Sequence, residues 1–133
     1  MIVYLDANIV IYLIENRPLW GPRAAAAIAA LRASGARLVV SDLTRLECRV
    51  GPLKSRDALL LGQFDAFFGD PGVTVLGLTA AVCDRAAEFR AHYGFKTPDA
   101  LHLAAALIHG CDRFLTNDNR LNACTAITID VLP

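Results

Sequence analysis

The chain has 133 residues, 55% of them hydrophobic, which is enough to bury one core and excludes an intrinsically disordered chain. Its 13 basic residues balance its 13 acidic residues, so the formal net charge at pH 7 is zero. This balance excludes a strong overall field that would attract the protein to nucleic acid or to anionic membranes. Any contact with nucleic acid must therefore depend on a local patch.

The four cysteines, at positions 48, 83, 111 and 124, form no C-x-x-C pair, and only three histidines are present. These counts indicate no zinc site and predict reduced thiols in a cytosolic protein. Asp6 interrupts the apolar run at the N-terminus, which is unlike a signal peptide, and no apolar run approaches the roughly 20 residues of a membrane span. We therefore expect a cytoplasmic protein that does not enter membranes.

Apolar runs and helical spacing divide the chain into alternating strands and helices. The predicted elements in chain order are a strand ending at residue 5, helices over 7–15 and 23–33, a strand over 37–40, helices over 43–50 and 56–68, a strand over 73–76, helices over 79–93 and 98–108, a strand over 113–116, a turn over 117–122, and a strand over 127–129.

Proline, glycine and capping residues set most of these predicted boundaries. Pro22 is expected to start the alanine-rich helix, and Gly51-Pro52 is expected to break the helix that Ser41 or Asp42 caps. Ser55 is expected to cap the following helix. Thr97 is expected to cap a later one, with Pro98 at its first position.

Strands that alternate with helices predict an α/β fold, and we expect residues 1–133 to form a single domain. The expected architecture is three-layer α/β/α, with a mostly parallel sheet of about five strands. In open sheets of this kind, ligands bind at the carboxyl ends of the strands. Polar side chains at those ends are therefore the candidates for function.

Four acidic residues occupy such positions: Asp6 after the first strand, Glu47 in the helix after the second, Asp99 in the first turn of the Pro98 helix, and Asp118 after the fourth strand. Each also has a purely structural interpretation: Asp6 as an N-cap, Glu47 in a capping box with Thr44, Asp99 as a partner of the helix dipole, and Asp118 in a turn. If the four meet in one crevice, their repulsion requires a cation. Ligands that are all carboxylates favour Mg²⁺ or Mn²⁺.

Four motifs carry these acids: Asp6-Ala7-Asn8, Thr44-Arg45-Leu46-Glu47, the run from Pro98-Asp99 to Ala105, and Phe114-Leu115-Thr116-Asn117-Asp118. Together, and in this order, they resemble the PIN domain, and within it the VapC toxins of prokaryotic toxin–antitoxin pairs. The resemblance extends from residue 2 to residue 129. It implies that Asp6, Glu47, Asp99 and Asp118 bind Mg²⁺ or Mn²⁺ and act in catalysis. It also implies that Asn8, Thr116 and Asn117 support the site.

The activity implied is that of a metal-dependent endoribonuclease. A divalent cation that activates water and neutralises phosphate oxygens makes a protein nucleophile unnecessary. Local basic residues are the candidates for holding the RNA backbone, although each is equally well explained as part of a solvated helix face. They are Arg45, Arg49, Arg113 and Arg120. His102, one turn after Asp99, is interpreted first as a hydrogen-bonded core residue.

The resemblance also implies a cognate antitoxin protein as partner and a homodimer. The helix over 7–15 and the phenylalanine-rich stretch 64–68 are expected to supply the apolar contact surface. Two alternatives stay open. A phosphohydrolase of the haloacid-dehalogenase kind also has an aspartate after its first strand, but it would need a second acid where Asn8 stands. A catalytically silent PIN-fold interaction module would show no cleavage at all.

Overall fold

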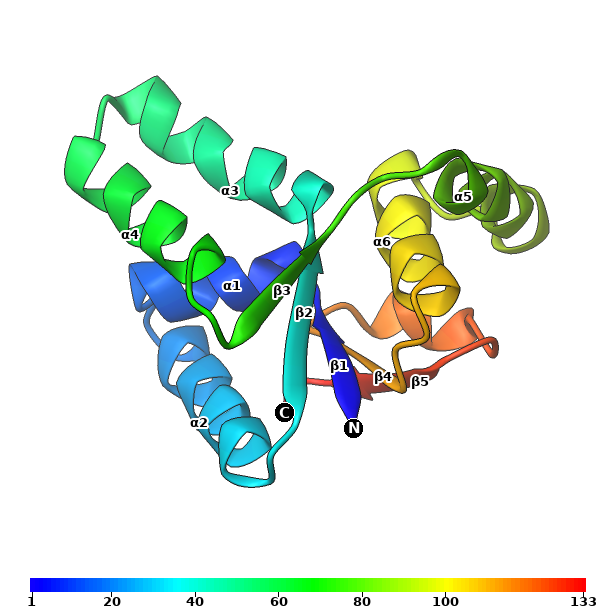
Figure 1. Ribbon diagram of the computed structural model, residues 1–133, viewed down its shortest axis with the longest axis horizontal. Coiled ribbons are helices and arrows are strands. Elements are labelled where there is room, and N and C mark those ends of the chain that lie inside the picture. Colours follow the sequence, from blue (N-terminus) through cyan, green and yellow to red (C-terminus); the bar gives the residue numbers. More distant parts are fainter.

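Five parallel strands form the centre of the computed structural model, which describes residues 1–133 (Figure 1). Their order across the sheet is β3-β2-β1-β4-β5, and all four pairings are parallel. The strands are β1 (Ile2–Leu5), β2 (Arg37–Ser41), β3 (Val73–Leu76), β4 (Arg113–Thr116) and β5 (Thr128–Val131). The helices are α1 (Ala7–Glu15), α2 (Trp20–Ala33), α3 (Asp42–Ser55), α4 (Ala58–Phe68), α5 (Ala80–Tyr93) and α6 (Thr97–Ile108), followed by the short η1 (Asn119–Ala123).

Helices cover both faces of the sheet, and alternate strand residues supply two separate cores. Tyr4 and Phe114 contribute to the core that α5 and α6 complete. Their neighbours Val3, Leu5 and Leu115 contribute to the core beneath α1, α2 and α4 (Figure 1). The predicted α/β/α fold with five strands is therefore confirmed, and the sheet is parallel throughout.

The helices and the cysteines can be compared with the expectations about membranes and thiols. None of the helices combines the length and apolar character that crossing a membrane requires. All four cysteines are free thiols, and three of them are buried.

The predicted break at Gly51-Pro52 is wrong, because α3 continues through both residues to Ser55. Pro52 removes one backbone donor from the helix ladder, but the residue is buried, so the packing of its ring opposes that loss. The helix ends instead where Arg56 adopts a left-handed conformation, with φ 56°. The next cap consequently moves from Ser55 to Asp57, whose side chain accepts a hydrogen bond from Leu60 N at 3.0 Å.

Other boundaries shift by one to three residues. Helix α2 begins at Trp20, which places Pro22 at the third helical position, where a backbone N–H has no partner within the helix in any case. Helix α6 begins at Thr97, because the carbonyl of Lys96 accepts the first helical bond, from Ala100 N at 3.0 Å. Strand β5 begins one residue later than predicted and ends two residues later.

The phenylalanine-rich stretch lacks the expected apolar surface, whereas on the first helix Ile11, Leu13 and Ile14 stay partly exposed. Phe64, Phe67 and Phe68 are buried beneath the sheet, together with Ile9 and Val10 of α1. The exposed large apolar side chains lie elsewhere, and they include Leu46, Val50 and Leu53 along α3 and Leu59 on α4.

Helices α1 and α2 meet at Gly21, where there is no space for a larger side chain. A Cβ at Gly21 would lie 2.7 Å from the backbone carbon of Asn16, whose own backbone is left-handed with φ 47°. Gly21→Ala is therefore expected to destabilise the protein by about 1–3 kcal/mol, measured by urea unfolding.

Gly62 provides the matched control, because it lies exposed inside α4 with nothing within 4 Å of an added Cβ. Gly62→Ala should raise the free energy of unfolding by about 0.5–1 kcal/mol, since alanine is the better helix former. Equal stability of the wild type and Gly21→Ala would show that the two helices do not approach this closely.

Candidate functional site

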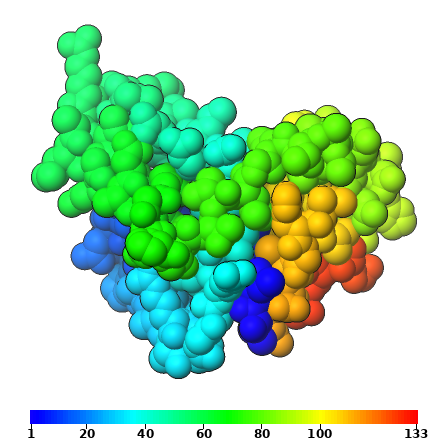
Figure 2. Space-filling model, in the orientation of Figure 1, coloured from blue at the N-terminus to red at the C-terminus, as the bar shows by residue number.

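The candidate site lies at the carboxyl ends of β1 and β4, where the strand order reverses. The chain proceeds from β1 to β2 and β3 on one side of the sheet, and then crosses back to β4 and β5 on the other side. Such a reversal leaves a crevice between the two central strands, and ligands bind there in open sheets. In the space-filling view, the outline of the molecule dips between the α3–α4 pair and the α5–α6 pair, above these strands (Figure 2).

Asp6 is the buried carboxylate at the centre of this edge. Its Oδ1 accepts a hydrogen bond from Ala7 N at 2.8 Å, so it caps α1 as one interpretation of the sequence predicts. Its Oδ2 accepts a hydrogen bond from the Thr116 hydroxyl at 2.7 Å. Burial raises the pKa of Asp6, while His102 and these two hydrogen bonds act in the opposite direction.

Glu47 reaches the same edge from α3 through His102. His102 Nε2 hydrogen-bonds Glu47 Oε1 and lies 4.0 Å from Asp6 Oδ1. The capping box predicted for Glu47 is wrong, because Thr44 instead pairs with Ser41, whose backbone N–H donates to Thr44 Oγ1 at 3.1 Å. The Nε2 atom of His102 is therefore hydrogen-bonded to Glu47 and lies near Asp6.

The other ring nitrogen of His102 joins a buried polar chain. His102 Nδ1 lies 2.7 Å from the Tyr4 hydroxyl, which donates to Ser41 Oγ at 2.8 Å. Burial raises the pKa of Tyr4, so its hydroxyl stays neutral. Sequence reasoning did not identify Tyr4 or Ser41, and it interpreted His102 first as a core residue. The available signal was that His102 follows Asp99 by three positions, which places both on one helix face.

Asp99 is the acid without a partner. It lies half-buried in the first turn of α6, and its side chain makes no hydrogen bond or ion pair with any other residue of the protein. Burial raises the pKa of Asp99, and the negative charges of Asp6 and Asp118 raise it further. Asp99 therefore lies close enough to Asp6 and to Asp118 for their negative charges to repel its own.

Asp118 is held by Arg120. The guanidinium Nε lies 2.9 Å from Asp118 Oδ1, Nη2 lies 2.5 Å from Oδ2, and the backbone N–H of Arg120 donates to Oδ1 at 2.9 Å. These contacts lower the pKa of Asp118. The backbone N–H of Asp118 donates to Thr116 Oγ1 at 3.1 Å, so Thr116 links this acid to Asp6.

The two remaining polar residues of the predicted site differ in their contacts. Asn117 donates from Nδ2 to the Tyr12 hydroxyl at 3.0 Å, and so it contacts α1 rather than a carboxylate. The Oδ1 atom of Asn8, two residues after Asp6, is buried and has no hydrogen-bond partner.

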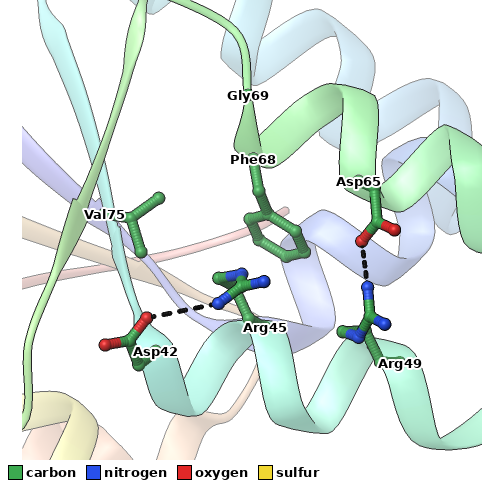
Figure 3. Close-up of a pocket in the computed structure, with 7 residues that line it drawn as sticks. All are labelled: Asp42, Arg45, Arg49, Asp65, Phe68, Gly69 and Val75. Carbon is green, nitrogen blue, oxygen red and sulfur yellow. Dashed lines mark hydrogen bonds and ion pairs between the residues drawn. The ribbon is translucent and has the colours of Figure 1, made fainter.

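The predicted basic contacts are mostly not at this edge. Arg45 and Arg49 share one face of α3, where they line a pocket with Asp42 and Asp65, their respective ion-pair partners (Figure 3). Glu47 lies between them in sequence, so it points to the opposite side of the helix. Arg113 lies at the amino end of β4 and pairs with Asp130 at 2.8 Å.

Arg120 is the exception, because it lines a hollow together with Asp99. The hollow has a volume of about 270 Å³, and its walls include Tyr93, Phe95 and Lys96. Of the four arginines predicted to contact substrate, the structure brings only Arg120 to the acids.

The donor set suits a hard divalent cation, although no group of three or more His, Cys, Asp or Glu side chains is arranged to hold a metal ion. Asp6 and Asp118 are already engaged by protein donors, and Glu47 is turned toward His102. Asp99, without a partner, and the orphaned Asn8 oxygen are the free donors. The four acids offer only oxygen ligands, and Asp99 lies near the negative charges of Asp6 and Asp118, which is an environment that suits Mg²⁺ or Mn²⁺.

Comparison with solved structures identifies proteins of the same shape. The chain is similar to VapBC2 of Rickettsia felis bound to a DNA fragment from its promoter, with a TM-score of 0.83, 18% identity and coverage of 100% of both chains. It is similar to VapBC-1 of nontypeable Haemophilus influenzae, with a TM-score of 0.76, 23% identity, and coverage of 99% of this chain and 98% of that chain.

A third similar structure is VapC20 of Mycobacterium tuberculosis, described as a sarcin-ricin loop cleaving toxin. Its TM-score is 0.78 at 17% identity, with coverage of 98% of this chain and 99% of that chain. The TM-scores show that the fold is shared, and at identities this low the comparisons show the fold alone.

Comparison at the level of sequence families gives the assignment. No curated protein matches the chain significantly. The family model described as PIN domain matches residues 3–125, a range that contains all four acids and the whole of β1 to η1 except Ile2. As its motifs predict, this chain belongs to the PIN domain family.

Proposed function

We propose that this protein is a divalent-metal-dependent endoribonuclease and the toxin of a type II toxin–antitoxin pair. The observation that carries the proposal is the crowding of Asp6, Asp99 and Asp118 at one edge of the sheet, with Asp99 left without any protein partner. Similar structures support the biological setting, since they include members of the VapBC family of toxin–antitoxin systems and a sarcin-ricin loop cleaving toxin.

Asp6 and Asp99 are the residues that would hold the cation, with Asp118 completing the site. A bound Mg²⁺ or Mn²⁺ supplies a Lewis acid that activates water and neutralises the charge of a phosphodiester. The Thr116 hydroxyl fixes the direction of the Asp6 carboxylate, and His102 fixes that of Glu47. Residues that orient a ligand in this way influence metal affinity and activity without touching the metal. That Glu47, Asn8 and Asn117 take part in the site remains a prediction.

The substrate would enter beside Asp99, where Lys96 and Arg120 line the adjoining hollow. Cations at this position would hold a phosphate of the RNA backbone, because phosphate contacts fix the position of a nucleic acid without reading its sequence. Since the net charge of the protein is zero, this local pair is a stronger candidate for the role than any overall field.

The proposed partners of the protein are a cognate antitoxin and a second copy of this chain. The exposed leucine and valine side chains along α3 provide apolar area that a partner helix would cover. A monomeric mass in solution would contradict the dimer alone and would leave the nuclease proposal unaffected.

RNA cleavage is the direct test. Protein freed of any bound partner is expected to cut total prokaryotic RNA into discrete fragments in Mg²⁺ or Mn²⁺. Asp99→Asn should reduce the rate by more than the roughly 10- to 100-fold that loss of a supporting residue produces. EDTA should abolish the cleavage.

Intact RNA together with measured Mn²⁺ binding would reject the nuclease, and release of phosphate from simple esters would then favour the phosphohydrolase. With neither cleavage nor metal binding, the chain would be an interaction module.

Thermal unfolding separates metal binding from catalysis. Mn²⁺ at about 100 times its dissociation constant should stabilise the wild type by about 2.7 kcal/mol and raise Tm by on the order of 10 °C. Asp99→Asn should lose this response. Without metal, the variant should be slightly more stable than the wild type at pH 7, because burial and neighbouring charges already disfavour the ionised Asp99. Equal Mn²⁺ responses in both proteins would exclude Asp99 as a ligand.

His102 should matter for activity through Glu47. His102→Leu leaves Glu47 and the Tyr4 hydroxyl without their shared partner, so cleavage should fall by roughly 10- to 100-fold. Tyr4→Phe keeps the contact between His102 and Glu47, and should therefore lose much less activity. If both variants cleave RNA like the wild type, the buried polar chain has no part in the reaction.

A further inference from the structure

We propose that Arg120 is a positioning residue that occupies the metal-binding carboxylate of Asp118 in the free protein and releases it when a phosphate of the RNA enters. This inference rests on the proposed function and extends it to the order in which substrate and metal bind. It assigns to one side chain of this protein the task of coupling the two events.

The contacts of Asp118 divide into two kinds. The backbone N–H of Arg120 donates to Oδ1, and this contact does not depend on the arginine side chain. The contacts to Oδ2 come only from the guanidinium, through Nη2 at 2.5 Å and Nε at 3.1 Å. If the guanidinium leaves, Oδ2 becomes free while the backbone still orients the carboxylate.

Exposure makes such a movement inexpensive. The side chain of Arg120 is 69% exposed and that of Asp118 is 21% exposed. An arginine in this position can exchange one partner for another without leaving water, and ion pairs near the surface are weak. The carboxylate, in contrast, keeps the hydrogen bond from the backbone N–H of Arg120.

A second position for the guanidinium lies beside it. Arg120 lines the hollow that also contains Lys96 and Asp99. A phosphate there would attract the guanidinium, because arginine forms strong paired hydrogen bonds with phosphate oxygens as well as with carboxylates. Phosphate and Asp118 would therefore compete for the same donors.

Charge gives the coupling its direction. With Arg120 on Asp118, a positive charge already compensates the three acids, so a cation must displace it or bind to fewer ligands. With Arg120 on a phosphate, the acids lose that compensation and gain a free oxygen. Substrate and metal would then bind cooperatively, and the free protein would hold metal less tightly than its carboxylates allow.

Mn²⁺ affinity, measured by isothermal titration calorimetry without RNA, tests the first step. Arg120→Ala is expected to bind Mn²⁺ about two- to fivefold more tightly than the wild type, since the ion no longer breaks an exposed ion pair. Arg113→Ala is the matched control, because Arg113 also pairs with an aspartate, at 2.8 Å, but on the opposite edge of the sheet. It should leave the affinity unchanged.

A double-mutant cycle separates this role from that of a nearby positive charge. In the Asp118→Asn background, removal of Arg120 should tighten Mn²⁺ binding clearly less than in the wild type. Equal tightening in both backgrounds, or none in either, would overturn the proposal.

Binding of a fluorescein-labelled single-stranded RNA decanucleotide, measured by anisotropy in EDTA, tests the second step. Arg120→Ala should bind this RNA about two- to fivefold more weakly than the wild type, and Arg113→Ala should not. Unchanged RNA binding in Arg120→Ala would also overturn the proposal.

Neither readout depends on cleavage, so the two proposals fail separately. If the expected shifts occur but no RNA is cut, the nuclease is wrong and the role of Arg120 stands. If RNA is cut but Mn²⁺ affinity is indifferent to Arg120, only the inference about Arg120 is wrong.

Discussion

The parallel pairing of β1 with β4 is the constraint on which the site depends. The register places Leu5 opposite Leu115, and the backbone N–H of Asp6 donates to the Leu115 carbonyl at 2.9 Å. The next residue of β4 is Thr116, so its hydroxyl meets the Asp6 carboxylate directly. These segments are 110 positions apart in the chain. A shift of one residue in this pairing would turn every side chain of β4 to the other face and remove the contact.

The buried polar chain also depends on elements that are distant in the sequence. His102, Tyr4 and Ser41 come from α6, β1 and β2, and each has a hydrogen-bond partner although all three are buried. Unpartnered polar groups at such positions would be costly, so the chain requires all three elements to be correctly placed. Packing of the core and orientation of Glu47 are therefore parts of one arrangement.

The site concentrates negative charge in a protein whose net charge is zero. Burial raises the pKa of both Asp6 and Asp99, and the charge of Asp6 raises that of Asp99 further, whereas Arg120 lowers the pKa of Asp118. The negative charge of the acids favours binding of a cation, and the guanidinium of Arg120 already compensates part of that charge. Under the proposed function, contact with RNA would depend on local charges near the site and not on an overall field.

The sequence by itself determined the α/β/α fold, the five strands, the family and the four acidic positions, because apolar periodicity and short motifs are local signals. Through the resemblance it also indicated that Thr116 supports the site that contains Asp6, and the structure shows a direct hydrogen bond between the two side chains. Helix boundaries at Pro52 and Ser55 were misjudged, because burial of the proline ring is a tertiary effect that outweighs the local preference.

Only the tertiary structure decided which polar groups act together. The sequence places His102 on the same helix face as Asp99, but it does not show that His102 is the partner of Glu47, since these two residues are 55 positions apart. Likewise, nothing in the sequence distinguished Arg120, which lies beside the acids, from Arg45, Arg49 and Arg113, whose side chains pair elsewhere. Contacts of this kind depend on the direction in which each helix and strand presents its side chains, and that direction is set by the packing of the whole fold.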